Sequence, residues 1–276
     1  MLAGAATLAL LVAGCTDASP GATPTQVAPT QVAPTTAVPT TSIPTEPPQS
    51  PPPAPSPTTP SPTTPSPTTS SPSPEPTSDA LERGDEGPAV LALQEQLAEL
   101  GYWLGRPDGT FGHLTEQAVF ALQGAAGLTR DGVVGPLTRA ALEAGVLPSV
   151  RSSSGSVVEI DLDAGTLTFA EDGAPRRVLH TSTGTFKPYT YEGRELLADT
   201  PRGEWEVTWA YDGWRTSPLG RLYRPRYFHP DGVAVHGYTS VPAYPASHGC
   251  ARVSIAAMDM IWREGLMPRG MPVLVY

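Results

Sequence analysis

The stretch YPASHGCARVS, Tyr244–Ser254, holds one of the two cysteines in this chain of 276 residues. Cys250 lies four residues before Ser254, which we expect to cap a helix that runs to Gly265. The thiolate is the reactive form of cysteine, and a nearby helix N-terminus favours it. Gly249 allows a sharp backbone turn beside the thiol. The stretch favours a nucleophile at position 250, with a metal ligand or a small buried side chain as alternatives.

His236 lies fourteen residues before Cys250 and follows the alternating residues Val233 and Val235. This alternation predicts a strand that ends at His236, and a strand–loop–strand return would bring the imidazole to the thiol. The imidazole could then accept the thiol proton. Backbone N–H groups around Gly249 and Cys250 could hold a developing oxyanion.

Zinc binding is the competing chemistry for the same residues. Cys250, His248, His236 and His229 offer thiolate and imidazole ligands, but the chain has neither CxxC nor HExxH spacing. We therefore expect no metal site.

The sequence around these residues alternates with a period of two, which is typical of half-buried strands. Asp172-Gly173 is a hairpin turn signal. Strands are expected at Val158, Ile160 and Leu162, at Leu167 and Phe169, at Trp205, Val207 and Trp209, and in the closing stretch 272–276. The fold class predicted for residues 156–276 is mainly β, a sandwich or barrel with one helix after Cys250.

The motifs of residues 156–276 resemble the L,D-transpeptidase catalytic domain of the YkuD type. They are Thr183-Gly184, TPRG at 200–203, DGWRTSPLG at 212–220, His236-Gly237-Tyr238, SHGC at 247–250 and Ala251-Arg252. The resemblance departs from the family at two points. The loop between His236 and Ser247 has only ten residues, which implies an altered acceptor side, and Ala251 replaces a larger aliphatic residue.

The resemblance implies a role for each residue of the motif. Cys250 would be the acylated nucleophile, His236 its base, and the Gly237 carbonyl would orient the imidazole. His248 would support catalysis or make a structural hydrogen bond. The acyl pocket and oxyanion site would be formed by Ser247, His248, Gly249 and Arg252. No cofactor is implied.

A basic run follows in the same domain, with Arg215, Arg221, Arg224 and Arg226 interleaved with aromatic residues. Forked guanidinium groups suit the carboxylates of a peptide substrate. Candidate substrate-binding residues are Tyr238, Arg221, Arg224 and Tyr227. The alternative is a solvated loop with structural ion pairs.

Residues 80–148 show helical periodicity instead. Pro88 is expected to begin a first helix, which ends at Gly101 and has an apolar stripe at Val90, Leu93, Leu97 and Leu100. Thr115 is a candidate cap of a second helix. Gly135-Pro136 is expected to begin a third. The strings GDEGPAVLALQEQLAELGYW, DGTFGHLTEQAVFALQ and GLTRDGVVGPLTRAAL resemble the peptidoglycan-binding domain 1 family. The resemblance implies a small all-α, three-helix domain that binds cell-wall glycan or stem peptide. The Gly and Asp residues are also explained by turns alone.

The first 79 residues are predicted to target and tether the protein. Residues 1–15 end in Val-Ala-Gly-Cys, which resembles a bacterial lipobox and implies lipidation of Cys15. The segment departs from a typical signal because no Lys or Arg precedes the motif. An ordinary secretory signal or an N-terminal anchor is the alternative. Residues 16–79 are rich in Pro, Thr and Ser and form a disordered tether. Residues 149–155 are a short linker.

The net charge is −10, with 16 Arg and one Lys, and no basic stripe, which argues against a nucleic-acid partner. We expect a monomeric, exported, membrane-anchored lipoprotein facing the cell wall. The two resemblances imply that it joins peptidoglycan stem peptides through 3→3 cross-links by a Cys250 thioester, with release of D-alanine. An L,D-carboxypeptidase that uses the same cysteine, or a catalytically silent wall-binding lipoprotein, are the alternatives.

Overall fold

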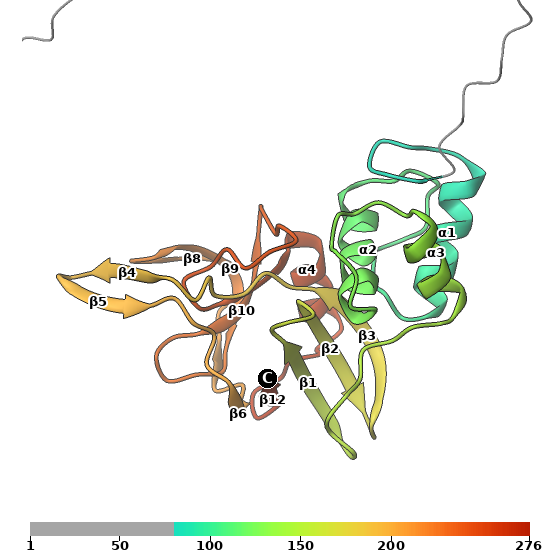
Figure 1. Ribbon diagram of the computed structural model, residues 1–276. Helices are drawn as coiled ribbons and strands as arrows, with labels where there is room; N and C mark the ends of the chain where they lie inside the picture. The colour runs from blue at the N-terminus through green and yellow to red at the C-terminus, as the bar shows by residue number, and fades with distance from the viewer. Residues whose placement is uncertain (1–79) are drawn as a thin grey trace, which may run out of the picture. The chain divides into compact units, whose positions relative to one another are not determined.

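The computed structural model describes residues 80–276, in which a helical domain precedes a mainly-β domain (Figure 1). Residues 1–79, with the predicted signal, the lipidation site Cys15 and the tether, lie outside the described residues. None of the helices formed by residues 80–276 is long and apolar enough to cross a bilayer. The fold class predicted from the sequence is confirmed.

The helical domain consists of α1 (Pro88–Glu99), α2 (His113–Ala125) and α3 (Pro136–Glu143). Proline occupies the first turn of α1 and α3, where its missing N–H costs no hydrogen bond. Gly101 follows α1 with a φ of 89°, the left-handed conformation of a helix stop. These predicted boundaries are confirmed.

The predicted role of Thr115 as a helix cap is wrong. The helix begins two residues earlier, at His113, and its N-cap is Gly112 without a side-chain hydrogen bond. The Thr115 side chain is buried instead, and its hydroxyl accepts a hydrogen bond of 2.9 Å from Nε2 of Gln94. Threonine at this position therefore joins α2 to α1.

The mainly-β domain has two five-stranded sheets. The first has the order β3 (Ala174–His180), β2 (Thr166–Glu171), β1 (Ser156–Asp161), β12 (Pro272–Val275) and β6 (Gly203–Glu206). The second has the order β11 (Ala251–Ser254), β10 (Ala234–Tyr238), β9 (Gly220–Tyr227) and β7 (Trp209–Ala210), with β8 (Trp214–Ser217) also paired to β9. Between them lies an apolar core that includes Val158, Ile160, Val235, Val253 and Met258.

Helix α4 (Ile255–Arg263) follows β11 directly and packs against the second sheet. Its N-cap is Ser254, whose side chain accepts a hydrogen bond of 3.1 Å from the N–H of Ala257, so the predicted cap is confirmed. The closing strand and the hairpin turn at Asp172-Gly173 are confirmed as well.

The predicted strand through Trp205, Val207 and Trp209 is in fact two strands in different sheets. Strand β6 ends at Glu206 and pairs with β12, whereas β7 begins at Trp209 and pairs with β9. The backbone changes partners between them, because the N–H of Val207 donates to Met271 and the N–H of Thr208 to Tyr227. Alternation along one segment cannot distinguish one strand from two that share a core.

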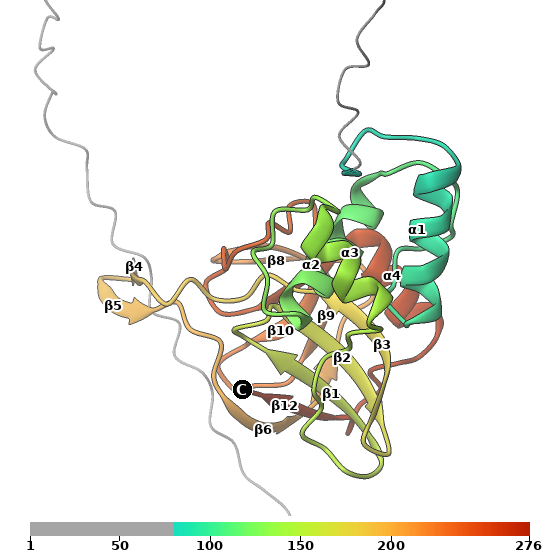
Figure 2. The same cartoon turned by 45° about the vertical axis from the view of Figure 1, so that its right-hand side comes forward.

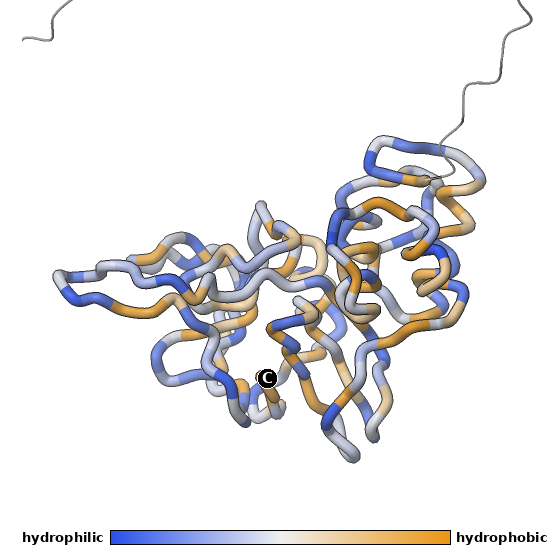
Figure 3. Tube along the Cα trace, viewed as in Figure 1, coloured by the Kyte–Doolittle hydropathy of each residue, from blue (hydrophilic) through white to orange (hydrophobic). Residues whose placement is uncertain are grey.

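A hairpin formed by β4 (Pro188–Tyr191) and β5 (Arg194–Leu197) was not predicted. Its turn, Glu192-Gly193, has positive φ values of 50° and 73°, as a two-residue hairpin turn requires. The tip is hydrophilic, and the hydrophobic residues Leu196 and Leu197 follow along β5 (Figure 3). The hairpin projects from the domain on the side of β8 and β9 (Figure 1).

The helical domain packs on the first sheet through α2 and β3, which lie side by side in both views (Figure 1, Figure 2). The N–H of Trp103 donates to Val178 at 2.9 Å, and the N–H of Val178 donates to Gly101 at 2.9 Å. Val178 is buried in the core of the helical domain although it belongs to β3. The two domains thus share backbone hydrogen bonds and apolar contacts.

Candidate active site

The predicted return of the chain brings Cys250, at the start of one strand, to the neighbouring strand that contains His236. Strand β10 pairs in parallel with β11, and His236 stands opposite Arg252 in this register. Cys250 directly precedes β11. His236 lies inside β10 and does not end it, since the strand continues to Tyr238.

The His236 side chain is buried, and its Nδ1 lies 3.0 Å from the carbonyl oxygen of Gly237. A carbonyl can only accept, so Nδ1 carries a proton and Nε2 is the nitrogen that can receive one. Burial lowers the pKa of His236 to about 4, against the opposing effect of the Gly237 hydrogen bond. The imidazole is therefore neutral at neutral pH, with Nε2 available as a base.

Position 237 accepts only glycine. A Cβ there would lie 2.9 Å from the ring of Tyr223 and 3.1 Å from the Cβ of Met258. The carbonyl that fixes the imidazole therefore belongs to a backbone packed tightly against β9 and α4.

Cys250 is half-buried, and its Sγ lies 4.0 Å from the carbonyl oxygen of Gly232. Burial raises the pKa of the Cys250 thiol, while a hydrogen bond from the Ala234 backbone and the charge of Arg252 oppose the rise. Within residues 80–276, no hydrogen bond joins Cys250 to His236. The thiol is therefore protonated at rest.

The turn that carries Cys250 is held by hydroxyl groups. Oγ of Ser247 donates to the Cys250 carbonyl at 2.6 Å and accepts from the N–H of Gly249 at 3.0 Å. Oγ1 of Thr200 donates to the Gly249 carbonyl at 2.7 Å. Gly249 has a φ of 140°, and a Cβ there would lie 2.6 Å from the carbonyl oxygen of Asp199. Glycine is thus required beside the thiol.

Arg252 lies beside both reactive residues. Its Nη1 donates to the Ala246 carbonyl at 2.9 Å, and its guanidinium lies 4.2 Å from the centre of the Tyr238 ring. Its Nε is buried and has no hydrogen-bond partner among the described residues. The charge of Arg252 lowers the pKa of both Cys250 and His236.

These residues open on one cleft of about 760 Å³. The cleft lies between the β4–β5 hairpin, the β8–β9 hairpin and the Cys250 turn. Of the predicted site residues, its lining contains His236, Tyr238, Ser247, His248, Gly249, Cys250, Arg252, Arg215, Arg221 and Tyr227. His248 is exposed, and its ring lies 4.8 Å from that of Tyr189 on β4.

Comparison with a solved structure identifies this arrangement. The crystal structure of the L,D-transpeptidase (residues 123-326) from Xylanimonas cellulosilytica is 51% identical, covers 73% of this chain and 100% of that chain, and has a TM-score of 0.71. This chain belongs to the L,D-transpeptidase family. The YkuD model, the L,D-transpeptidase catalytic domain, matches residues 155–275, and the peptidoglycan binding domain model PG_binding_1 matches residues 86–142.

Two curated relatives match shorter parts. N-acetylmuramoyl-L-alanine amidase CwlL of Bacillus licheniformis is 40% identical over 96 residues, 34% of this chain and 27% of its own length. An uncharacterised protein of Kitasatospora aureofaciens is 47% identical over 64 residues, 23% of this chain and 54% of its own length. The chain thus spans about a quarter and about half of these relatives.

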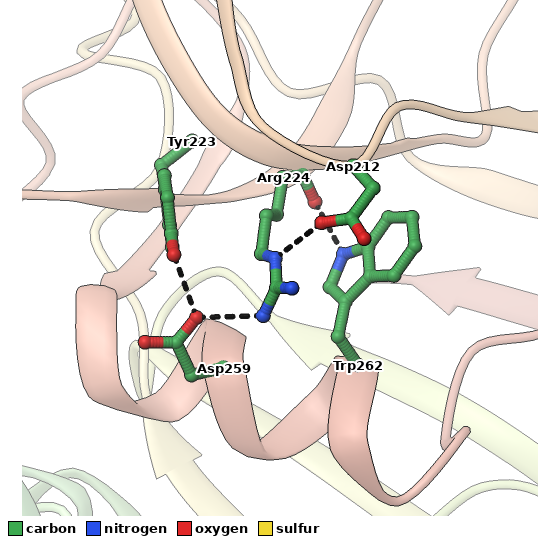
Figure 4. Close-up of polar contacts among 5 residues, drawn as sticks. All are labelled: Asp212, Tyr223, Arg224, Asp259 and Trp262. Carbon is green, nitrogen blue, oxygen red and sulfur yellow. Dashed lines mark hydrogen bonds and ion pairs between the residues drawn. The ribbon is translucent and has the colours of Figure 1, made fainter.

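Arg224 of this L,D-transpeptidase-family chain lies outside the cleft. Its guanidinium pairs with Asp212 at 2.6 Å and with Asp259 at 2.8 Å, and its carbonyl accepts from Nε1 of Trp262 at 2.8 Å (Figure 4). Arg226 is buried, and its Nη1 donates to the Met267 carbonyl at 2.8 Å. Both arginines therefore join β9 to α4 or to the segment that follows it. For these two residues the structure supports the alternative in which the basic run makes structural contacts.

The zinc alternative has no support from the arrangement of the described residues. Among residues 80–276, no three His, Cys, Asp or Glu side chains are close enough together to hold a metal ion. His229 packs edge-on against Trp205 instead, with ring centres 4.3 Å apart.

Sequence reasoning missed two parts of the site. Thr200 was included only as part of a motif, without a role, although it holds the Cys250 turn. The β4–β5 hairpin contributes Tyr189, Tyr191 and Arg194 to the lining. The Glu192-Gly193 pair between a Tyr-rich and a Leu-rich segment was the signal for it.

Proposed function

We propose that this protein is a peptidoglycan L,D-transpeptidase that uses Cys250 as its nucleophile and forms 3→3 cross-links. The observation that carries the proposal is that one cleft of an L,D-transpeptidase-family domain contains both the Cys250 thiol and the buried, neutral imidazole of His236. A nucleophile and a base are the two groups that acyl transfer requires.

In the first half-reaction, Sγ of Cys250 attacks the carbonyl carbon of the third stem residue. The thiol proton passes to Nε2 of His236, and then to the nitrogen of the departing D-alanine. A thioester remains on Cys250. Because both groups are neutral at rest, the proton moves as the substrate is attacked, and the nearby Arg252 stabilises the thiolate that develops.

The oxyanion of the tetrahedral intermediate needs an N–H donor that has no other partner. The N–H of Gly249 already donates to Ser247, so we assign this role to the N–H of Cys250, with His248 at the same edge of the cleft.

In the second half-reaction, the side-chain amine of a neighbouring stem attacks the thioester. His236 accepts the amine proton, the new amide forms, and Cys250 leaves as the thiol. The chain of ten residues between His236 and Ser247 borders this acceptor side. Its shortness favours the second candidate, an L,D-carboxypeptidase, in which water replaces the amine.

Substrate carboxylates are proposed to contact Arg221, with Tyr227 and Tyr238 lining the same cleft. Arg224 is left out of this set, because Asp212 and Asp259 already hold its guanidinium.

The remaining parts would bring the enzyme to its substrate. The helical domain would bind the wall and raise the local concentration of stem peptides. Lipidation of Cys15 would anchor a monomer outside the cell membrane, and residues 16–79 would reach from the membrane to the wall.

Mass spectrometry tests the proposal, with the protein incubated with a disaccharide-tetrapeptide beside its Cys250→Ala variant. Loss of D-alanine together with a cross-linked dimer, both absent in the variant, is expected. Tripeptide without dimer would establish the carboxypeptidase. No change in either sample would leave a silent wall-binding protein and overturn the role of Cys250.

A further inference from the structure

The loop from Thr239 to Ala246, between the strand of His236 and the turn of Cys250, is held by three side chains on three successive carbonyls. Nε2 of Gln117 donates to Val241 at 3.0 Å. Nε2 of His180 bonds to Pro242 at 2.9 Å, and Nε of Arg130 donates to Ala243 at 2.7 Å. Gln117 lies in α2 and Arg130 follows it, so two of the three donors come from the helical domain.

The same loop is connected onward to the reactive residues. Oγ of Ser182 donates to the Tyr244 carbonyl at 2.7 Å, and the backbone N–H groups of Ala246 and Ser247 donate to Thr183. The carbonyl of Ala246 holds Arg252, whose charge acts on Cys250 and His236. The loop and its hydrogen bonds thus connect α2 to Arg252, whose charge acts on the thiol.

We propose that Gln117 and Arg130 are positioning residues for acyl transfer, so that the helical domain is a working part of the catalytic site as well as a wall-binding module. This inference rests on the proposed function. The two side chains hold the 239–246 loop in its position beside β3. The loop in turn positions Arg252 and Ser247 beside Cys250.

The junction is tight enough to transmit position. The Gln117 side chain is 6% exposed, and His180 is 3% exposed with its ring 5.3 Å from that of Phe120 on α2. A Cβ on Gly124 of α2 would lie 2.0 Å from the carbonyl oxygen of Ala164, so glycine lets the helix reach the β1–β2 turn. Nη1 of Arg130 also donates to the Asp163 carbonyl at 2.8 Å. The donors are therefore fixed relative to the first sheet.

Removal of these donors would leave buried carbonyls without partners, and such a loop shifts until water reaches them. Shifts of about 1 Å in a catalytic group lower turnover by about a hundredfold. Arg221 and Tyr227, the proposed contacts of the stem peptide, line the cleft from β9 and lie outside this loop, so peptide binding should be unaffected.

The test uses the full chain with Gln117→Leu and Arg130→Met combined. We expect kcat for cross-linked dimer to fall by about tenfold to a hundredfold, with KM for the disaccharide-tetrapeptide unchanged. When Arg130→Lys replaces Arg130→Met in the double variant, the side chain retains a donor, and part of the lost kcat should be recovered. The matched control is Gln96→Leu with Arg106→Met, at two exposed positions of the same domain, and should match the parent protein.

The pH profile of Cys250 alkylation by iodoacetamide gives a second readout that needs no transpeptidation. Its midpoint should move to higher pH in the double variant, because Arg252 no longer lies against the thiolate. Unchanged kcat and an unchanged midpoint in a folded double variant would overturn the proposal. If the parent protein does not turn over the tetrapeptide, the proposed function fails, and the midpoint alone decides the positioning role. If the double variant does not fold, Gln117→Leu alone is judged by the same two readouts.

Discussion

Two buried glutamines of the helical domain and two residues of the catalytic site differ in how fully their polar atoms are hydrogen-bonded. In the helical domain, Gln94 donates to Asp108, Thr110 and Thr115 and accepts from the N–H groups of residues 108 and 109. In the catalytic domain, the described residues leave His236 with a single hydrogen bond and Arg252 with an unpaired buried Nε. A saturated polar group holds a turn in place, whereas an unsaturated one remains available for a reaction.

The glutamine arrangement occurs twice. Gln123 donates to Asp131, Val133 and Thr138 and accepts from the N–H of Gly132, as Gln94 does with the preceding turn. Thr115 and Thr138 are each the third residue of the helix that follows the turn. The Asp and Gly residues of these turns are therefore accounted for by structure, which is the simpler of the two explanations considered for them.

Replacement of the base gives the largest expected difference between the domains. His236→Gln should lower kcat by about a thousandfold, because general base catalysis contributes about this much, with little change in thermal stability. Steady-state kinetics with the disaccharide-tetrapeptide measures the effect, and His113→Gln in α2 is the control. A loss of less than tenfold would mean that another group accepts the thiol proton.

Replacement of a saturated glutamine should affect stability. Gln123→Leu removes four hydrogen bonds to partners in one turn and the next helix, so we expect the free energy of unfolding to fall by about 3 kcal/mol. Urea denaturation checks this value. Gln96→Leu, at an exposed position of α1, should change it by less than about 0.5 kcal/mol. Equal effects of the two substitutions would remove the distinction between saturated and exposed glutamines.

The effect of acid on a single buried histidine is the smallest of the three expected effects, and it should arise in the catalytic domain. Burial lowers the pKa of His180 and of His236 to about 4, below the unfolded value of about 6.5. The unfolded chain therefore binds protons first as pH falls, and each histidine should lower the free energy of unfolding by about 2 kcal/mol between pH 7 and pH 5.

Urea titrations at the two pH values measure this acid effect. His180→Gln retains an N–H donor and should remove one histidine's share of the loss. A pH dependence that is the same in the parent and in His180→Gln would contradict the assignment.

Local signals predicted much of the fold and the centre of the site. Prolines at helix starts, the Ser254 cap and the Asp172-Gly173 turn each depend on a few neighbouring residues, and all are confirmed. The strand of His236 pairs with the strand that Cys250 directly precedes, which is the strand–loop–strand return predicted from their spacing.

The parts that sequence reasoning missed depend on partners far apart in the chain. Gln117 and Val241 are separated by 124 residues, and Arg130 and Ala243 by 113. Arg224 looked like a substrate contact until its ion pairs with Asp212 and Asp259 were known (Figure 4). Periodicity carries no information on such pairs, because it describes which face is buried and not what lies against it.

The close approach at Gly124 has a consequence for modularity. A helical domain taken from another protein, with any side chain at this position, would place a Cβ 2.0 Å from the carbonyl oxygen of Ala164. Grafting or recombination within residues 149–155 would therefore join such a helical domain to a catalytic domain against which it cannot pack. Residues 80–276 should be inherited and engineered as one unit, despite matching two separate family models.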